Sequence, residues 1–115
     1  MSESSILTAL EAVIAERKSR PPEGRSYVVS LLQGGVPKIG EKVMEEAGEV
    51  VEAAGEPGPA GEDHLVKEVA DLVFHTMVLM GHRGVAWEKV EAELARRFGI
   101  SGITEKESRP AHQNR

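Results

Sequence analysis

The stretch EDHLVKEVADLVFHTMVLMG, residues 62–81, decides the fold class of this chain. Its apolar residues are distributed around every side of a helix, which is typical of a helix that is buried on most of its surface. Along one edge, Glu68, Asp71 and His75 follow one another at i, i+3 and i+7. Buried acids need a lysine, an arginine, a proton or a metal ion as a partner. The only lysine of the stretch, Lys67, lies on a different side from Asp71, so we interpret the two acids as functional.

A second acidic segment, KVMEEAGEVVEAA at residues 42–54, precedes this stretch. Its four glutamates are Glu45, Glu46, Glu49 and Glu52. Apolar residues at helical spacing form one stripe of the segment, and the glutamates lie opposite, with Glu46 on the border. The ordinary interpretation is a solvated face on which lysines pair with glutamates, at about 0.2–0.5 kcal/mol per i,i+4 pair. Glu45 and Glu49 are instead like charges at i,i+4, which a divalent cation would neutralise.

The two segments are separated by GEPGPAG at residues 55–61, which we interpret as a turn between antiparallel helices. Their acidic edges, EExxE at 45–49 and ExxD at 68–71, are then expected to converge. Carboxylates around one cavity offer only oxygen ligands, which suit Mg²⁺ or Mn²⁺ completed by substrate phosphates. A di-iron site would need Glu-x-x-His pairs, and Leu72 stands three residues before His75, so redox iron is disfavoured.

The remaining sequence also predicts helices, and alternating strand patterns are nearly absent, so the fold class is all-α. Helices are expected over residues 5–18, 26–33, 37–54, about 62–81, and from after Gly84 to Gly99. So few helices can hardly cover the apolar helix at 62–81 within one protomer. We therefore expect a homodimer.

Composition limits the function classes. The 115 residues carry a formal net charge of −5, which argues against a nucleic-acid partner and is compatible with an enzyme that recruits divalent cations. The chain has no cysteine, which excludes disulfides and thiolate zinc sites. Its N-terminus lacks the features of a signal peptide, and its longest apolar stretch, residues 69–80, is too short to span a bilayer. We expect a cytoplasmic protein without a membrane partner.

EExxE followed by ExxD resembles the motifs of the all-α nucleoside-triphosphate pyrophosphatase (MazG-like) superfamily. Longer stretches narrow the resemblance to the phosphoribosyl-ATP pyrophosphatase family of histidine biosynthesis. These stretches are PPEGRSYVVSLLQGGVPKIGEKVMEEAGEVVEAA (21–54), VKEVADLVFHTMVLMGHRGVAWEKVEAEL (66–94) and RRFGISGITEKESR (96–109). The resemblance gives one domain over residues 1–109, followed by a polar tail at 110–115 that we expect to be disordered.

The resemblance implies Mg²⁺-dependent hydrolysis of phosphoribosyl-ATP to phosphoribosyl-AMP and pyrophosphate, with Mn²⁺ as an alternative cation. It also implies a helical bundle that is completed by an intertwined homodimer. The metal ligands that it implies are Glu46, Glu49, Glu68 and Asp71. Helical phase would instead pair Glu45 with Glu49, so Glu45 and Glu46 compete for one role. We favour Glu46 as the ligand and Glu45 as an outer ligand or the group that orients the attacking water.

The candidates for substrate contact are Ser26, Tyr27, Lys38, Lys42 and His75. The first two correspond to the Ser-Tyr motif of the family, although Val28 stands where a threonine often follows. The two lysines share a face with the glutamates, so they either supply charge to phosphates or pair with the glutamates. The histidine follows Asp71 by one turn, and it either touches substrate or is a buried, hydrogen-bonded structural residue.

Two other functions are compatible with parts of this sequence pattern. A MazG-like housekeeping enzyme acting on other nucleoside triphosphates has the same acidic motifs, and only SYVVSLL and SGITEKESR separate it from the first interpretation. A non-catalytic helical interaction module with an acidic surface gives no reason for Glu68 and Asp71 to interrupt an apolar helix.

Overall fold

A computed structural model of the chain describes residues 5–99. These residues form helices and no strand, which confirms the all-α prediction. The helices are α1 (Ile6–Ser19), α2 (Tyr27–Ala54), α3 (Gly58–Arg83) and α4 (Glu88–Phe98). The first three helices belong to one compact unit that ends at Gly84, and α4 belongs to a second unit. The tail at 110–115, predicted to be disordered, lies outside the described residues.

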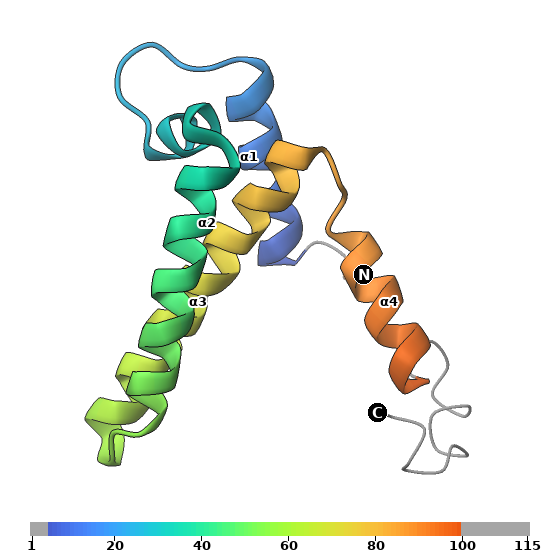
Figure 1. Cartoon of the computed structure of the whole chain (residues 1–115). Coiled ribbons are helices and arrows are strands. Elements are labelled where there is room, and N and C mark those ends of the chain that lie inside the picture. The colour runs from blue at the N-terminus through green and yellow to red at the C-terminus, as the bar shows by residue number, and fades with distance from the viewer. Residues whose placement is uncertain (1–4, 100–115) are drawn as a thin grey trace. The chain divides into compact units, whose positions relative to one another are not determined.

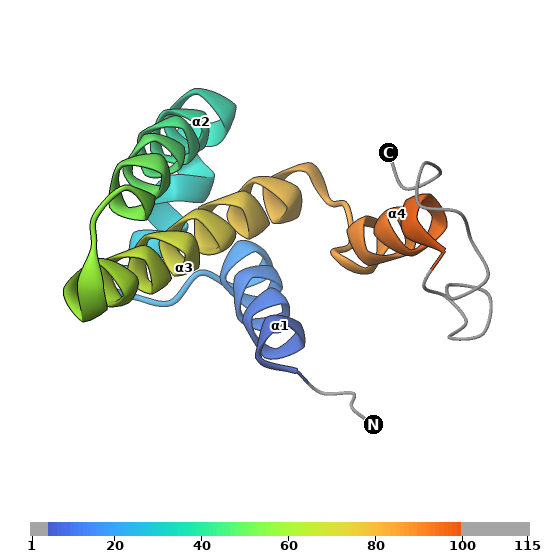
Figure 2. The ribbon, with the colours of Figure 1, turned by 90° about the horizontal axis from the view of Figure 1, so that it is seen from below.

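Helices α2 and α3 run antiparallel and pack against each other, joined by a short turn (Figures 1 and 2). The separate helices predicted at 26–33 and 37–54 are joined in α2, with a kink at Gly35. Gly35 has φ 70° and ψ −164°, a backbone conformation that residues other than glycine rarely adopt. Pro37 follows in the first turn after the kink, where its missing N–H costs no helical hydrogen bond.

The predicted helix start near residue 62 is wrong, because α3 begins at Gly58. The glycines and prolines of 55–61 resemble a loop, but Pro59 lies in the first helical turn, where proline is tolerated. Gly61 is buried in this helix, and a Cβ at Gly61 would overlap with the backbone carbonyl group of Glu56. The missing side chain therefore lets the turn pack directly onto α3.

Helix α1 packs on both α2 and α3. The largest fully buried side chains come from all three helices and are Ile14, Leu31, Ile39 and Val78. A Cβ at Gly81 of α3 would lie 2.7 Å from Cγ2 of Ile14, so α1 and α3 approach closely there. The Nζ of Lys18 donates to the carbonyl oxygens of Gly81 and His82 at 2.9 and 3.1 Å. Lys18 thereby satisfies carbonyl groups at the C-terminal end of α3.

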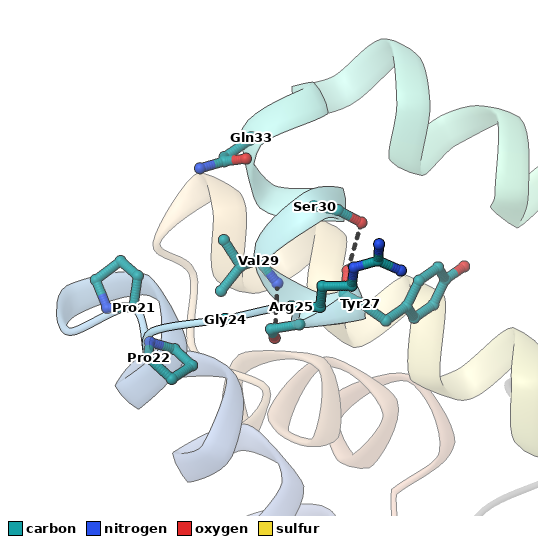
Figure 3. A pocket seen from close by; sticks show the side chains of 9 residues that line it. Pro21, Pro22, Gly24, Arg25, Tyr27, Val29, Ser30 and Gln33 are labelled. Carbon is teal, nitrogen blue, oxygen red and sulfur yellow. Dashed lines mark hydrogen bonds between the residues drawn. The ribbon is translucent and has the colours of Figure 1, made fainter.

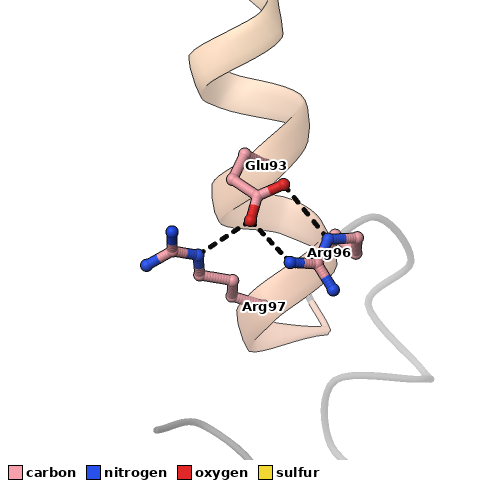
Figure 4. Close-up of polar contacts among 3 residues, drawn as sticks. All are labelled: Glu93, Arg96 and Arg97. Carbon is pink, nitrogen blue, oxygen red and sulfur yellow. Dashed lines mark hydrogen bonds and ion pairs between the residues drawn. The ribbon is translucent and has the colours of Figure 1, made fainter.

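Helix α4 is stabilised by local ion pairs (Figure 4). The carboxylate of Glu93 accepts hydrogen bonds from Nε of Arg96 at 3.1 Å and from Nε of Arg97 at 2.9 Å. Hydrogen bonds from these two guanidinium groups lower the pKa of Glu93 to about 2. Within residues 5–99, no helix has the length and apolar character needed to cross a membrane.

Candidate metal and substrate site

The acidic edges of α2 and α3 meet at one cluster. Glu46 of α2 and Glu68 and Asp71 of α3 each contribute a carboxylate oxygen, and these three oxygens lie within 4.8 Å of one another. Glu46 is only 7% exposed. Its Oε1 and the Oε1 of Glu68 are buried and have no hydrogen-bond partner among the described residues. Buried carboxylate oxygens are costly unless they are paired, so this all-oxygen cluster fits a hard divalent cation.

Glu49, the fourth predicted ligand, is not among these three residues, but it interacts with Glu68 of α3. Hydrogen bonding to the Glu68 carboxyl group, together with repulsion from its charge, holds the pKa of Glu49 above its usual value. Glu45 lies outside the cluster, exposed to solvent, with its Oε1 3.2 Å from Nζ of Lys42. The periodicity of one helix places Glu46 at a border, and the packing of α3 on α2 is what buries it.

His64 has no role in the sequence interpretation, yet it lies beside this cluster. Its Nδ1 is 2.9 Å from Oε1 of Glu56, and its Nε2 is 3.3 Å from Oε2 of Glu68. The hydrogen bond to Glu56, assisted by the charges of both glutamates, raises the pKa of His64. The i,i+4 spacing of His64 and Glu68 was the only available signal, because the contact with Glu56 depends on the turn between the helices.

Tyr27 and His75, two of the candidates for substrate contact, bind each other. Nδ1 of His75 lies 2.8 Å from the backbone carbonyl oxygen of Asp71, which only accepts, so Nδ1 carries a proton. In the neutral ring, Nε2 then accepts a hydrogen bond from the Tyr27 hydroxyl at 2.7 Å. His75 is 4% exposed, which matches the alternative of a buried, hydrogen-bonded residue. It links Tyr27 to the turn of α3 that carries Asp71.

Tyr27 also lines a cavity of about 540 Å³ where the chain enters α2 (Figure 3). Ser26, another lining residue, uses its hydroxyl as the N-cap of α2, accepting from the backbone N–H of Val29 at 3.2 Å. A second cavity of about 300 Å³ shares three lining residues with the first and adds Leu32 and the polar side chains of Arg17, Lys18 and His82. Together with Arg25 in the first cavity, these side chains give the region a basic character.

The two candidate lysines of α2 differ in their contacts. Lys42 pairs with Glu45, as one of the two interpretations expects, and this carboxylate raises the pKa of Lys42. Lys38 is exposed and forms no ion pair with the residues that the structure describes. Of the two, Lys38 is therefore the charge that is free to meet an anionic ligand.

Comparison with known proteins identifies the family. Residues 7–98 match the family described as phosphoribosyl-ATP pyrophosphohydrolase. The chain belongs to this family. Three curated relatives are named phosphoribosyl-ATP pyrophosphatase. The relative from Rhodopirellula baltica is 50% identical over 109 residues, covering 95% of this chain and 87% of the relative. The relative from Neisseria meningitidis is 50% identical over 105 residues, covering 91% of this chain and 94% of the relative. The relative from Geobacter metallireducens is 52% identical over 105 residues, covering 91% of this chain and 93% of the relative.

Proposed function

We propose that this chain hydrolyses phosphoribosyl-ATP to phosphoribosyl-AMP and pyrophosphate, the second step of histidine biosynthesis, in the cytoplasm. Its relatives are named for this activity. The structural observation that carries the proposal is the buried Glu46 beside Glu68 and Asp71, because its Oε1 has no hydrogen-bond partner within residues 5–99. Such a cluster of carboxylates is suited to a cation and to an anionic substrate that the cation neutralises.

The residues proposed to hold the cation are Glu46, Glu49, Glu68 and Asp71, with Mg²⁺ as the cation and Mn²⁺ as the alternative. A divalent cation at this site supplies positive charge to phosphate oxygens and makes water more acidic. Glu45, exposed and adjacent to the cluster in sequence, is assigned the orientation of the attacking water. Lys38 and Lys42 are assigned the charge that meets the polyphosphate.

The nucleotide is proposed to bind at the cavity beside Ser26 and Tyr27. The volume of about 540 Å³ is in the range of small-ligand sites. Half of the Tyr27 surface is exposed, while its hydroxyl is fixed by the bond to His75. This arrangement supports a role in which Tyr27 contacts the substrate and His75 acts through Tyr27. Arg25, at the same cavity, is suited to a phosphate group.

A homodimer formed through α2 and α3 is part of the proposal. Met44 and Val51 of α2 are 74% and 73% exposed, and Val66 of α3 is 62% exposed. Exposed apolar surface of this kind marks interaction sites, and an intertwined second copy would cover it. Sedimentation at micromolar concentration should show a wild-type dimer and a monomeric Val51→Lys variant. A monomeric wild type would contradict this part of the proposal.

The deciding experiment compares turnover of phosphoribosyl-ATP with turnover of a panel of nucleoside and deoxynucleoside triphosphates in the presence of Mg²⁺. We expect phosphoribosyl-ATP to be strongly preferred, with pyrophosphate as a product. Glu49→Ala and Asp71→Ala should both abolish the reaction while the helical circular dichroism stays largely intact. Retained turnover in both variants would exclude the assigned ligands, and preference for other triphosphates would favour a MazG-like housekeeping activity.

A further inference from the structure

The two carboxylate oxygens of Glu68 have different surroundings. Oε2 lies 3.3 Å from Nε2 of His64, whereas Oε1 is buried and has no hydrogen-bond partner among the described residues. A glutamate side chain has several rotatable bonds, and fixing it in one orientation costs conformational entropy. A contact that engages one oxygen and leaves the other free reduces this cost before a ligand binds.

His64 is itself held from the other side. Its Nδ1 lies 2.9 Å from Oε1 of Glu56, in the short turn between α2 and α3. The backbone of Glu56 is also held in place. Its N–H donates to the carbonyl oxygen of Ala53 at 3.0 Å, and its carbonyl group occupies the space that a side chain at Gly61 would fill. The turn, the imidazole and Glu68 therefore form one connected series of contacts that ends at the acidic cluster.

We propose that His64 is a positioning residue that holds Glu68 in its cation-binding orientation, with Glu56 of the turn as its anchor. This inference rests on the proposed function, because it requires a divalent cation at the cluster. Partners of this kind, which contact a ligand of the metal and not the metal itself, set the orientation of the ligand. His64 and Glu68 are one helical turn apart in α3, so the helix itself supplies the correct spacing.

A protonated His64 would also repel the cation. This repulsion would weaken cation binding, whereas the positioning of Glu68 strengthens it. The side chain of His64 is 39% exposed, so solvent and salt screen its charge. The side chain of Glu68 is only 14% exposed, so its orientation is set by the few groups that contact it, and His64 is one of them. Positioning should therefore dominate, and removal of His64 should weaken cation binding.

The test measures binding of Mn²⁺ to the substrate-free full chain, by electron paramagnetic resonance of the free ion. Typical losses for such partners predict that His64→Ala binds Mn²⁺ about 10–100-fold more weakly than wild type. His64→Gln keeps an N–H donor toward Glu68 and should recover most of the affinity. Glu56→Ala frees the imidazole from its anchor and should give an intermediate loss.

Lys67→Gln is the matched control for charge. Lys67 precedes Glu68 directly and pairs with Asp63 at 3.3 Å, so the variant removes one exposed positive charge from the same turn of α3. Its Mn²⁺ affinity should stay within about twofold of wild type, because exposed charges are screened. In the reaction, His64→Ala should raise the Mg²⁺ concentration needed for half-maximal rate more than it lowers kcat at saturating Mg²⁺.

Unchanged or tighter Mn²⁺ binding in His64→Ala, with unfolding by heat as in wild type, would overturn the inference. If that variant does not fold, undiminished Mn²⁺ affinity in Glu56→Ala would overturn it. Glu46→Gln separates the two proposals. Loss of binding in Glu46→Gln but not in His64→Ala removes only the role of His64. A wild type that binds no Mn²⁺ removes the cation site and this inference with it.

Discussion

Glu93 of α4 and Glu46 of the acidic cluster are the same residue type in opposite surroundings. Glu93 is accessible to solvent and accepts hydrogen bonds from Arg96 and Arg97, which lower its pKa to about 2. Glu46 is buried, its Oε1 lacks a hydrogen-bond partner in the described part of the chain, and its neighbours in the cluster are acidic. A carboxylate with its own counter-charges stabilises local structure. A buried carboxylate without them indicates a place where a ligand is needed.

The largest expected difference between the two regions is in activity. Because loss of a partner of a metal ligand typically costs 10–100-fold, loss of a ligand should cost more, and Glu46→Gln should lower cation-dependent pyrophosphate release by more than about 100-fold. Glu93→Gln removes a charge that is satisfied within α4 and should change the rate by less than about twofold. Both rates are measured at saturating Mg²⁺. Comparable losses in the two variants would remove the distinction between a paired and an unpaired carboxylate.

A second prediction creates an unpaired buried group on purpose. His75 is as buried as Glu46, but both of its ring nitrogens have partners. Tyr27→Phe removes the hydroxyl that donates to Nε2, so an unsatisfied ring nitrogen remains in the core and the free energy of unfolding should fall by about 1–3 kcal/mol. Urea unfolding gives this value.

Ser30→Ala is the control for Tyr27→Phe, since it removes an exposed hydroxyl that donates to the Tyr27 carbonyl oxygen at 2.9 Å. Its cost should remain below about 0.5 kcal/mol, as is usual for surface substitutions. Equal losses in Tyr27→Phe and Ser30→Ala would show that burial of His75 does not penalise a missing partner.

The smallest expected effect is in the pH dependence of stability of the metal-free protein. The pKa of Glu49 is raised above 4.5 in the folded chain, so stability should increase slightly as the pH falls from neutral through that raised pKa. The pKa of Glu93 is lowered to about 2, so its ion pairs contribute above 4.5 and are lost as the pH falls toward about 2. Thermal unfolding followed by circular dichroism should show the increase before the decrease. The Glu49→Gln variant should not show the increase in stability, and the Glu93→Gln variant should not show the decrease.

Local patterns were sufficient to predict the helices. Apolar residues at helical spacing, together with proline and glycine at the ends, give the positions of α1, most of α2 and the greater part of α3. The start of α3 escaped prediction because Pro59 is compatible with both a loop and a first helical turn. The role of Gly61 depends on how the chain folds back on itself, and no local pattern contains that contact.

For the candidate site too, local patterns predict some residues, whereas others depend on contacts between helices. The spacing of the acids places Glu68 and Asp71 on one edge of a helix, and the structure brings them together with Glu46. The choice between Glu45 and Glu46 depends on which side of α2 is covered by α3, and one helix considered alone does not determine it. His64 was missed because its importance comes from simultaneous contact with Glu56 and Glu68, across a turn whose geometry periodicity does not describe.

The kink at Gly35 separates two groups of residues within α2. The cavity-lining residues of α2 all lie before the kink and are Tyr27, Val29, Ser30, Leu32 and Gln33, whereas residues 37–54 carry the carboxylates of α2. Because Gly35 has a non-helical backbone conformation between them, a substitution in one half need not shift the other. Under the proposed function, selection can then alter the nucleotide site while the cation site stays constant. Val29 and Gln33 line both cavities and lie before the kink, so under the proposed function they are the positions at which a protein engineer would vary specificity first.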